Sequence, residues 1–585
     1  MNGAEYVAKF LKAINVESVY LVQGGACAFM LDAVDREEGI DYVCFQHEQA
    51  AAMAADAIWR TNQKLGATFS TSGPGASNLI TGIACGYYDS IPSLHITGQV
   101  NGKEVAQYNG AKVRQAGFQQ MDIVTMVKPV CNYAEHVKDI QSLKQVLKDA
   151  VEAMFNGRMG PAVVDIPMDV QTEQLDDDTL LLPVIQKPVL DTQRISEVKT
   201  KILNFIAEAE RPLVVFGAGV ELAGVEKELE QWLRSTNIPF VASWSALNSF
   251  DHSMENYCGH FGVYGNRGGN YVIQNADRIL VLGSRLDNRQ RSGNPNTFGP
   301  SAKFLVVDID EEELKKYPSP QYEGIVLDLT HLPSVLQNAE VYPVRKYWKD
   351  YVKEMRDTYL NKDISVGAKE AQSLNPYEFI QRLNSMATDK AIFVTDAGAN
   401  HAMTYQIFKR NGDQKLITSS GHYSMGYSLP AAIGAKMMNP ETDVYSINGD
   451  GGIQMNLQEL QTLIEYNLDV KVVVFNNRGL GMIRQFQDTY MKGNHAATGD
   501  GRGPGRPNFQ KIAEAYQMAY VQILNVDDLM PHHFRLGKTL IEVIVSDKVL
   551  IEPKLEAGRP INDQFPYVSD EDYAKNNRYV TYTRR

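Results

Sequence analysis

Short runs of β-branched and aromatic residues, each closed by a glycine or polar turn, recur along the whole chain. In the last third, an apolar run over Asp443–Ile447 ends in the glycine-rich turn Asn448–Gly452. Leucines then recur at helical spacing, and a second apolar run over Val472–Phe475 leads to Asn476 and Asn477. Short apolar runs are typical of buried strands, and leucines three to four residues apart are typical of a helix. This stretch predicts a strand, a glycine turn, a helix and a second strand.

The first third of the chain repeats this plan. A strand predicted over Ala67–Ser70 is followed by the turn Thr71–Gly75, a helix over Ser77–Tyr87 and a strand over Leu94–Thr97. The pattern upstream predicts a helix from Tyr6, strands over Ser18–Val22 and Asp41–Phe45, and an alanine-rich helix over Ala50–Trp59. The repetition predicts two domains of one architecture.

A third series of strands lies between these regions, after a helix predicted over Val198–Ala209. Strands are predicted over Pro212–Phe216 and Arg278–Leu282, and each ends in a glycine-containing turn. The apolar segment FLVVDID, from Phe304, predicts a further strand. Such turns follow the strands of a dinucleotide-binding sheet, but glycine turns occur in any α/β domain. Both interpretations remain open on this pattern alone.

The chain has 585 residues, too many for one hydrophobic core, and three domains are expected. The fold class is α/β, with three doubly wound parallel-sheet domains. We expect the domains at residues 1–170, 196–345 and 375–550, linkers at 171–195 and 346–374, and a C-terminal tail at 551–585. The tail either docks on the protein or covers an active site, with five potential aromatic anchors: Phe565, Tyr567, Tyr573, Tyr579 and Tyr582.

Composition narrows the class of protein. Hydrophobic residues make up 44% of the chain and charged residues 22%, as in soluble globular proteins. The net charge of −13 argues against a nucleic-acid or anionic-membrane partner. The five cysteines show no CxxC spacing and are expected to be reduced core residues. No apolar stretch is long enough to cross a membrane, so we expect a cytoplasmic protein.

The turn at Asp450 and the asparagines that end the next strand carry candidate metal chemistry. The carboxyl ends of parallel strands meet at one edge of a sheet, so Asp450 and Asn477 are expected to be neighbours. Carboxylate and amide oxygens are ligands that Mg²⁺ prefers, and glycines let backbone N–H groups approach a phosphate. The alternative is an ordinary α/β crossover with a glycine turn.

Glu48 lies where a predicted strand meets the alanine-rich helix. A carboxylate at this position favours the helix dipole, which is a purely structural explanation. A sheltered carboxyl that gives and regains a proton is the catalytic alternative. We predict that Glu48 is buried.

Several motifs in combination resemble the acetolactate synthase branch of the thiamine diphosphate (ThDP) enzymes. They are Gly24-Gly25, HEQAA from His47, TSGPGASNLITGIACGYYDSIPSLHITGQ from Thr71, GPAVVDIPMDVQ from Gly160, and GDG at Gly449 followed by Asn476-Asn477. The resemblance implies that Asp450, Asn477 and the Gly479 carbonyl hold Mg²⁺. It also implies that Glu48 hydrogen-bonds the aminopyrimidine ring of ThDP and promotes deprotonation of the thiazolium.

The resemblance also implies the residues that bind the rest of ThDP, with Asn400-His401 at the diphosphate and Met425 as the wedge that bends the cofactor. A lone methionine is more often a core residue. The expected ThDP contacts are Gly24, Pro74, Asn78, Asn400, His401, Tyr423, Met425, Asp450, Gly451, Gly452, Asn477, Gly479, Leu480, Gly481 and Met482.

In the resembled family the middle domain holds FAD that performs no redox step in the main reaction. An empty domain and an adenine nucleotide are the alternatives. The expected FAD contacts are Gly217, Ala218, Gly219, Gly262, Gly283, Ser284, Arg285, Asp287, Arg289, Asp308, Ile309 and Asp328. The expected acceptor pocket is Gly25, Phe118, Gln119, Arg289, Met482 and Phe486.

The resemblance implies an enzyme that decarboxylates pyruvate and transfers the two-carbon unit to a carbonyl acceptor. Arg289 favours a 2-keto acid acceptor. The main alternative is a nucleotide-linked keto sugar, because Gln120, Thr404, Asn132 and Phe486 depart from the residues usual in biosynthetic acetolactate synthases. A non-catalytic partner subunit is a further alternative.

Glu48 and Asp450 lie in different domains, so the site must form between domains. In the resembled family that interface joins two chains. The resemblance therefore implies a homodimer or homotetramer, with a small regulatory subunit as a potential partner.

Overall fold

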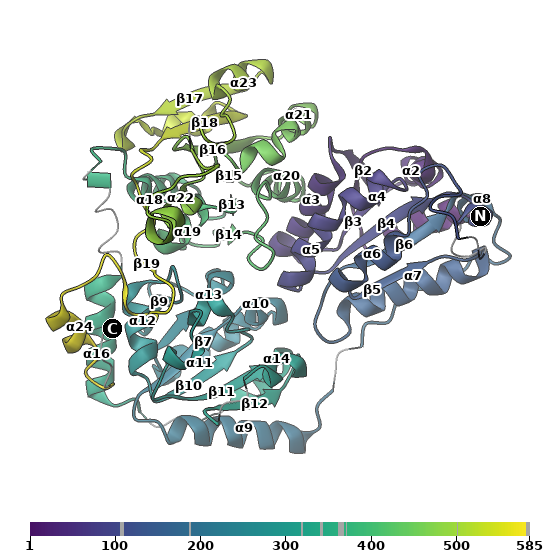
Figure 1. The fold of residues 1–585 in the computed structure, drawn as a ribbon. Coiled ribbons are helices and arrows are strands. Elements are labelled where there is room, and N and C mark those ends of the chain that lie inside the picture. Colours follow the sequence, from purple (N-terminus) through teal and green to yellow (C-terminus); the bar gives the residue numbers. More distant parts are fainter. Residues whose placement is uncertain are drawn as a thin grey trace.

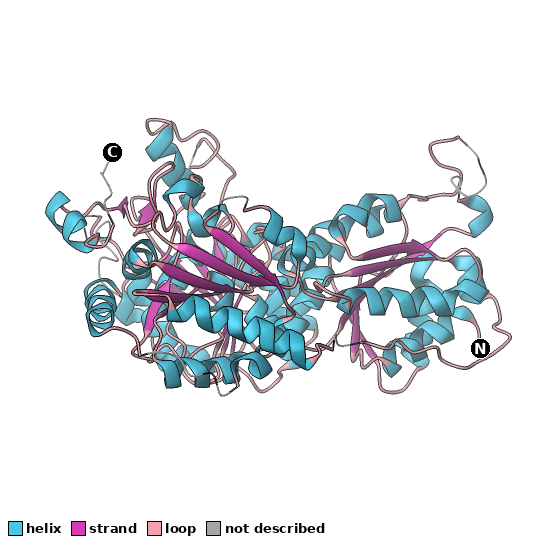
Figure 2. Cartoon of the chain, turned by 90° about the horizontal axis from the view of Figure 1, so that it is seen from below, coloured by secondary structure: helices cyan, strands magenta, loops and turns pink. Residues whose placement is uncertain are grey.

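A computed structural model of the chain describes residues 1–105, 110, 112–186, 189–317, 320–337, 339, 343–360, 368–369, 371–499 and 501–580. The described strands form three six-stranded sheets and one two-stranded hairpin. Figure 1 shows the three sheets as separate α/β units, and Figure 2 shows helices on both sides of the sheets. All strand pairs in the three large sheets are parallel, which confirms the expected fold class.

The first sheet is built from β1 (Ser18–Leu21), β2 (Asp41–Cys44), β3 (Gly66–Ser70), β4 (Ser93–Gln99), β5 (Tyr133–His136) and β6 (Ala162–Pro167). Its strand order is β2-β1-β3-β4-β6-β5. The helices of this region are α1 (Gly3–Ala13), α2 (Ala28–Arg36), α3 (Glu48–Asn62), α4 (Pro74–Asn78), α5 (Ile80–Asp89), α6 (Ile123–Val127), α7 (Ile140–Phe155) and α8 (Met168–Thr172).

The third sheet is built from β13 (Ile392–Thr395), β14 (Lys415–Ile417), β15 (Val444–Gly449), β16 (Val470–Asn476), β17 (Ala519–Ile523) and β18 (Thr539–Ile544). Its order, β14-β13-β15-β16-β18-β17, is that of the first sheet strand for strand. The prediction of two domains of one architecture is therefore confirmed. The helices are α18 (Pro376–Met386), α19 (Ala399–Ile407), α20 (Ser428–Met438), α21 (Leu460–Glu465), α22 (Gly481–Tyr490) and α23 (Phe509–Ala515).

The middle sheet has a different topology. Its strands are β7 (Pro212–Phe216), β8 (Phe240–Ala242), β9 (Tyr257–His260), β10 (Arg278–Leu282), β11 (Lys303–Asp308) and β12 (Tyr322–Val326), in the order β12-β11-β10-β7-β8-β9. Counted within the sheet this is 3-2-1-4-5-6, the order of a dinucleotide-binding fold. The helices are α9 (Thr192–Ala207), α10 (Gly219–Ala223), α11 (Glu226–Thr236), α12 (Arg267–Asn275), α13 (Asn288–Arg291), α14 (Glu311–Lys315), α15 (Leu332–Leu336) and α16 (Lys346–Tyr359).

Apolar side chains of the first and third sheets share one core. Ala50, Ala54 and Ala57 of α3 are buried with Ala431 and Ala435 of α20. Small side chains allow the two helices to approach closely, and Gly434 leaves room for the Ala54 carbonyl. Figure 1 shows α3 beside α20 where the purple and green parts of the chain meet. The shared core places the two sheets that carry the predicted site residues side by side.

The tail docks on the middle domain. β19 (Lys554–Leu555) and β20 (Gln564–Phe565) form the hairpin, and α24 (Asp570–Asn576) lies beside α12 and α16 in Figure 1. Tyr573 is buried, Tyr579 is half-buried against Trp348 and Tyr351, and Tyr567 is partly exposed. Tyr582, the last expected anchor, lies outside the described residues.

Two expected helices differ in detail, and the second expected linker packs partly against the middle domain. The helix expected over Ser77–Tyr87 is two helices that break at Leu79, directly after Asn78 turns its amide toward Glu48. The helix after the Asp450 turn begins as 3₁₀ turns before α21. The second expected linker contains α16, whose Trp348 is buried and donates its indole N–H to Pro212 O. Within the described residues, no helix combines the length and apolar character needed to span a bilayer.

Candidate cofactor site

The carboxyl edge of the third sheet brings the expected metal ligands together. β15 and β16 pair in parallel up to Gly449 and Phe475, so the turns that follow them are adjacent. The Gly479 N–H donates to Asp450 Oδ2 at 3.1 Å and lies 3.2 Å from Asn477 Oδ1. Asp450 is 1% exposed. These oxygens converge where the sequence predicted a magnesium site.

Two opposing effects act on the Asp450 carboxyl. Burial raises its pKa above the ordinary value because the charged form loses hydration. The Arg506 guanidinium, whose Nε lies 3.1 Å from Asp450 Oδ1, lowers the pKa in opposition. The Arg506 guanidinium thus favours the charged form of this carboxylate, and a divalent metal ion would stabilise that form in the same way.

Glycines at this edge leave space that side chains would fill. A Cβ at Gly452 would lie 1.8 Å from Asp396 Oδ2, and one at Gly451 would lie 2.7 Å from Leu480 Cδ2. A Cβ at Gly481 would lie 2.5 Å from Asn477 Nδ2. The turns can therefore pack this closely against Asp396, Leu480 and Asn477 only because these positions are glycine.

His401 lies on the adjacent turn in α19 with an unpartnered ring nitrogen. Burial lowers its pKa to about 3, so the ring is neutral at physiological pH. Its Nδ1 is 3.1 Å from Thr395 Oγ1, while its Nε2 is buried without a hydrogen-bond partner among the described residues. Tyr423 packs edge-on against the ring, with centroids 5.1 Å apart. Nε2 is available to a ligand oxygen.

Other expected ThDP contacts surround this edge. Asn400 is buried and donates to Asp396 O at 2.9 Å and Ile447 O at 3.0 Å, so its amide N–H groups bind the backbone. The Met425 Cε would lie 3.7 Å from a Cβ at Gly451, which places the side chain beside the glycine turn. Met482, in the first turn of α22, is half-buried.

Glu48 is the first residue of α3 and is 8% exposed, so its predicted burial is confirmed. The Asn78 amide donates to Glu48 Oε2 at 2.9 Å. A Cβ at Gly75 would lie 3.1 Å from Glu48 Oε1, so this carboxylate oxygen borders the turn that begins at Pro74. Gly24 packs against Thr71, whose Cβ would lie 2.5 Å from a Cβ at Gly24.

The third domain holds the segment that precedes Glu48. Glu459 is fully buried, and both its carboxylate oxygens lie 3.2 Å from the Gln46 N–H. Its Oε2 also accepts from Thr462 at 2.7 Å. Burial raises the Glu459 pKa to about 7. Glu459 of the third domain thus holds the segment that leads into Glu48, the candidate catalytic residue of the first domain.

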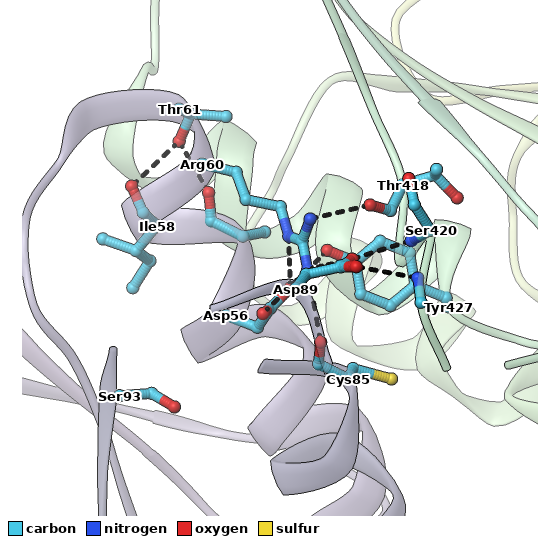
Figure 3. Close-up of polar contacts among 12 residues, drawn as sticks. Asp56, Ile58, Arg60, Thr61, Cys85, Asp89, Ser93, Thr418, Ser420 and Tyr427 are labelled. Carbon is cyan, nitrogen blue, oxygen red and sulfur yellow. Dashed lines mark hydrogen bonds and ion pairs between the residues drawn. The ribbon is translucent and has the colours of Figure 1, made fainter. Parts of the chain in front are cut away.

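A buried charge cluster joins the first domain to the segment that carries Tyr423 and Met425 (Figure 3). The Arg60 guanidinium contacts Asp56 at 2.7 Å, Asp89 at 2.9 Å and Thr418 O at 2.8 Å. The Asp89 carboxylate accepts the backbone N–H groups of residues 420 and 421, each at 2.7 Å. The cluster fixes the start of the expected cofactor segment.

The expected FAD contacts lie at the carboxyl edge of the middle sheet. The Gly217 N–H donates to Leu282 O at 2.9 Å, and a Cβ at Gly217 would lie 2.1 Å from Gly283 O. The turns after β7 and β10 therefore abut at the switch point of the sheet, where ligands of such folds bind. The other expected contacts end or follow strands at this edge: Ala218, Gly219, Gly262, Ser284, Arg285, Asp287, Arg289, Asp308, Ile309 and Asp328.

Individual contacts connect this edge with the neighbouring domains. Arg285 donates to Tyr88 O of the first domain at 2.8 Å. The Arg289 guanidinium lies over the Tyr423 ring of the third domain, 4.7 Å from its centroid. Asp308, at the end of β11, is buried, and this burial raises its pKa. Arg289 is thus the expected acceptor residue that reaches the cofactor segment.

The remaining expected acceptor residues are not enclosed together in the single chain. Phe118 is 85% exposed, and Gly25 is exposed with open space at its Cβ position. Gln119 contacts the Gly73 turn. Phe486 is 44% exposed and packs on Tyr490, with ring centroids 4.7 Å apart.

Sequence reasoning did not single out Asp89, Asp396, Glu459 or Arg506. Asp89 and Glu459 lie within helices or their ends, where a charged residue is ordinarily a solvated one. The signal for Arg506 was a basic residue in the glycine-rich loop GRGPGR, close to the metal motif in sequence. The burial that makes these residues notable arises only from contacts between distant segments.

The residues present fit ThDP and Mg²⁺. The glycine turn, the unpartnered Nε2 of His401 and the oxygens around Asp450 offer a diphosphate cradle and hard metal ligands. No group of three His, Cys, Asp or Glu side chains within the described residues could hold a metal, so this set relies on amide and backbone oxygens.

Comparison with known proteins gives the same assignment. Residues 1–126, 200–337 and 396–538 match, respectively, the N-terminal binding domain, the central domain and the C-terminal binding domain of thiamine pyrophosphate (ThDP) enzymes. The chain is 31% identical to an acetolactate synthase large subunit of Lactococcus lactis, over 95% of both chains. It is 31% identical to the isozyme 1 large subunit of Escherichia coli, over 95% of this chain and 96% of the other. The chain belongs to the thiamine diphosphate enzyme family, in its acetolactate-synthase-like branch.

Proposed function

We propose that the protein is a ThDP- and Mg²⁺-dependent carboligase that decarboxylates pyruvate and transfers the two-carbon unit to a 2-keto acid. The meeting of Asp450, Asn477 and Gly479 at one sheet edge carries the proposal, because it offers the oxygen ligands of a diphosphate-bound metal. The relatives named acetolactate synthase support pyruvate as the donor.

The expected site residues would have separate roles in binding the metal, binding the cofactor and transferring a proton. Asp450, Asn477 and the Gly479 carbonyl would hold Mg²⁺, and the Gly451-Gly452 backbone with His401 would bind the diphosphate. Met425 would support the bent form of the cofactor. When bound, ThDP supplies the electron sink that decarboxylation of a 2-keto acid requires. Glu48 would hold and return a proton at the aminopyrimidine ring.

FAD is the proposed ligand of the middle domain, in a non-redox role. The 3-2-1-4-5-6 strand order and the abutting glycine turns of β7 and β10 support a dinucleotide at this edge. Purified protein should release FAD on denaturation. Carboligation should persist when FAD is replaced by a redox-inactive analogue, and its loss at full occupancy would contradict the non-redox role.

The acceptor is proposed from Arg289, whose guanidinium lies over Tyr423 beside the cofactor segment and can pair with a carboxylate. A nucleotide-linked keto sugar is the second candidate. It is favoured by the departures from the residues usual in biosynthetic acetolactate synthases at Gln120, Thr404, Asn132 and Phe486.

Identification of the reaction product distinguishes between these two acceptors. Labelled pyruvate is supplied with ThDP, Mg²⁺ and FAD, alone or with 2-ketobutyrate or a nucleotide-linked keto sugar, and products are identified by mass spectrometry. We expect acetolactate, with weak preference between pyruvate and 2-ketobutyrate because one methylene contributes only about 1–3 kcal/mol. Phe486→Trp should suppress any keto-sugar reaction more than acetolactate formation. A keto sugar that outcompetes pyruvate would overturn the 2-keto acid assignment, and absence of decarboxylation would overturn the proposed function.

Assembly is proposed on two grounds. Several apolar residues around the candidate site are exposed in the single chain, among them Met455, Ile483 and Phe486, which supports a homo-oligomer that covers them. The relatives are named large subunits, which supports a small regulatory subunit as a partner. Mass measurement in solution, with and without such a subunit, tests both.

A further inference from the structure

A glycine-rich loop folds back onto the turn that carries Asp450. The Gln454 amide donates to Asp450 O at 3.0 Å and to Gly505 O at 3.4 Å, so it ties the loop to the turn. Arg506 Nη1 donates to Pro504 O at 2.5 Å within the loop. These contacts fix the base of the Arg506 side chain beside the candidate metal site.

The Arg506 side chain is buried although its hydrogen bonds are incomplete. It is 6% exposed, its Nε forms an ion pair with Asp450 Oδ1 at 3.1 Å, and neither Nε nor Nη2 has a hydrogen-bond partner among the described residues. A buried N–H donor without a partner costs free energy, and the cost is larger on a charged group. Such a donor is expected where a ligand completes the set.

Nη2 is directed at the glycine turn. A Cβ at Gly451 would lie 3.3 Å from Nη2 and 2.7 Å from Leu480 Cδ2, so the guanidinium can lie this close to the turn only because the residue is glycine. Nη2 therefore places an unpartnered, positively charged donor beside the backbone of the glycine turn. An anion with several acceptor oxygens fits that chemistry.

We propose that Arg506 binds the diphosphate of the cofactor, with Nη2 donating to a phosphate oxygen beside Gly451. The inference rests on the proposed ThDP function and adds a residue to it. Arg506 then has two partners, Asp450 through Nε and the diphosphate through Nη2. The guanidinium fork suits this task because it presents several N–H donors in fixed directions.

The contrasting explanation is that Arg506 only neutralises Asp450 until a metal ion replaces it. The two explanations predict opposite signs. A diphosphate ligand is lost when Arg506 is replaced by a neutral residue, so affinity falls. If Arg506 only neutralises Asp450, its replacement by a neutral residue removes a competitor of the metal ion. Mg²⁺ and ThDP would then bind more tightly.

Titration calorimetry of the purified full chain at saturating Mg²⁺ tests the inference. The probes are ThDP and, separately, inorganic diphosphate, and the variants are Arg506→Gln and Arg506→Lys. Arg502→Gln is the matched control, because Arg502 lies in the same loop but is exposed and donates to Asn494 at 3.3 Å. Circular dichroism checks that each variant is folded.

We expect Arg506→Gln to raise the Kd for both probes about 10- to 100-fold, the scale of a hydrogen bond between charged groups. Arg506→Lys should recover part of the loss, and Arg502→Gln should bind as the unchanged chain does. Equal or tighter binding by Arg506→Gln would overturn the role of Arg506 while leaving the proposed function intact. Failure of the unchanged chain to bind ThDP would instead overturn the proposed function and this inference with it.

Discussion

Two buried carboxyl groups in the candidate site have different partners. Asp450 lies beside the Arg506 guanidinium and accepts a backbone N–H, an environment that can hold a charged carboxylate. Glu48 accepts from the neutral Asn78 amide and borders the Gly75 turn. A charged ligand group and a proton-exchanging group are expected to differ in this way.

The role of Glu48 predicts the effect of Glu48→Gln. Glutamine keeps the shape and can still accept from Asn78, so the protein should fold and bind ThDP. It cannot give and regain a proton, so turnover should fall about 100-fold or more. Calorimetry for ThDP binding and a pyruvate-consumption assay measure the two properties. Glu38→Gln, at an exposed position, is the control, and turnover within about threefold of the unchanged chain would refute the role.

The Glu459 carboxyl predicts a pH dependence of stability. Its pKa rises from 4.5 to about 7 in the folded chain because it is buried. Between about pH 4.5 and pH 7 the folded chain keeps a proton that the unfolded chain releases. The free energy of unfolding therefore falls as pH rises through this window, by at most about 3 kcal/mol, and levels off above pH 7.

Denaturant unfolding at pH 5 and pH 8 tests this linkage. The drop in the denaturation midpoint should be smaller in Glu459→Gln, which has no titrating group, than in the unchanged chain. Glu465→Gln, at an exposed position at the end of α21, the helix that follows Glu459, should keep the full drop. An identical drop in all three proteins would contradict the assignment.

At the scale of elements, the turn between β14 and α20 depends on a helix of another domain. Asp89, the last residue of α5, accepts two backbone N–H groups at the start of this turn. Its carboxylate also forms an ion pair with Arg60 of α3. The turn then continues through Tyr423 to Met425. The first domain therefore positions a segment of the third domain before any cofactor binds.

This arrangement predicts that Asp89→Asn weakens ThDP binding without removing any group expected to touch the cofactor. Asparagine loses the charge that pairs with Arg60, and its amide nitrogen cannot accept the second N–H. We expect the Kd for ThDP to rise about 10-fold or more, because hydrogen bonds to charged groups contribute about 1.5–3 kcal/mol each. Asp32→Asn, which removes an exposed ion pair with Arg36, is the matched control. Equal ThDP affinity in both variants would contradict the positioning role.

At the scale of the whole molecule, the tail stabilises the middle domain through buried polar contacts. Arg267 donates to Gln564 O at 3.0 Å and to Pro566 O at 2.7 Å, and Asn270 donates to Ile561 O at 2.8 Å. Tyr351 donates to Asn576 O at 2.7 Å. These contacts favour the docking role over a cover for the active site.

Truncation after residue 557 separates the two roles. Loss of the tail would remove the hydrogen bonds that it accepts from Arg267 and Asn270, which contribute about 1–3 kcal/mol each. We expect a lower melting temperature and faster proteolysis of the middle domain. A truncated protein with unchanged stability but altered acceptor preference would favour the cover instead.

Much of the fold was predictable because its signals are local. The strands over Pro212–Phe216 and Arg278–Leu282 lie where their apolar runs predicted them. The proximity of the Asp450 and Asn477 turns followed from parallel pairing alone. The break at Leu79 was not predictable, because it accompanies a contact between Asn78 and Glu48 that no local pattern records.

The sequence by itself determined the fold class, the repeated architecture and the family, since these depend on apolar periodicity and on motifs that persist at fixed spacing. Only the tertiary structure decided which charged residues are buried and which groups they bind. Asp89, Glu459 and Arg506 act across segments far apart in the chain, and their desolvation arises only when those segments pack together. Burial and charge pairing are properties of the packed chain, and for this reason the sequence alone could not assign these residues their places.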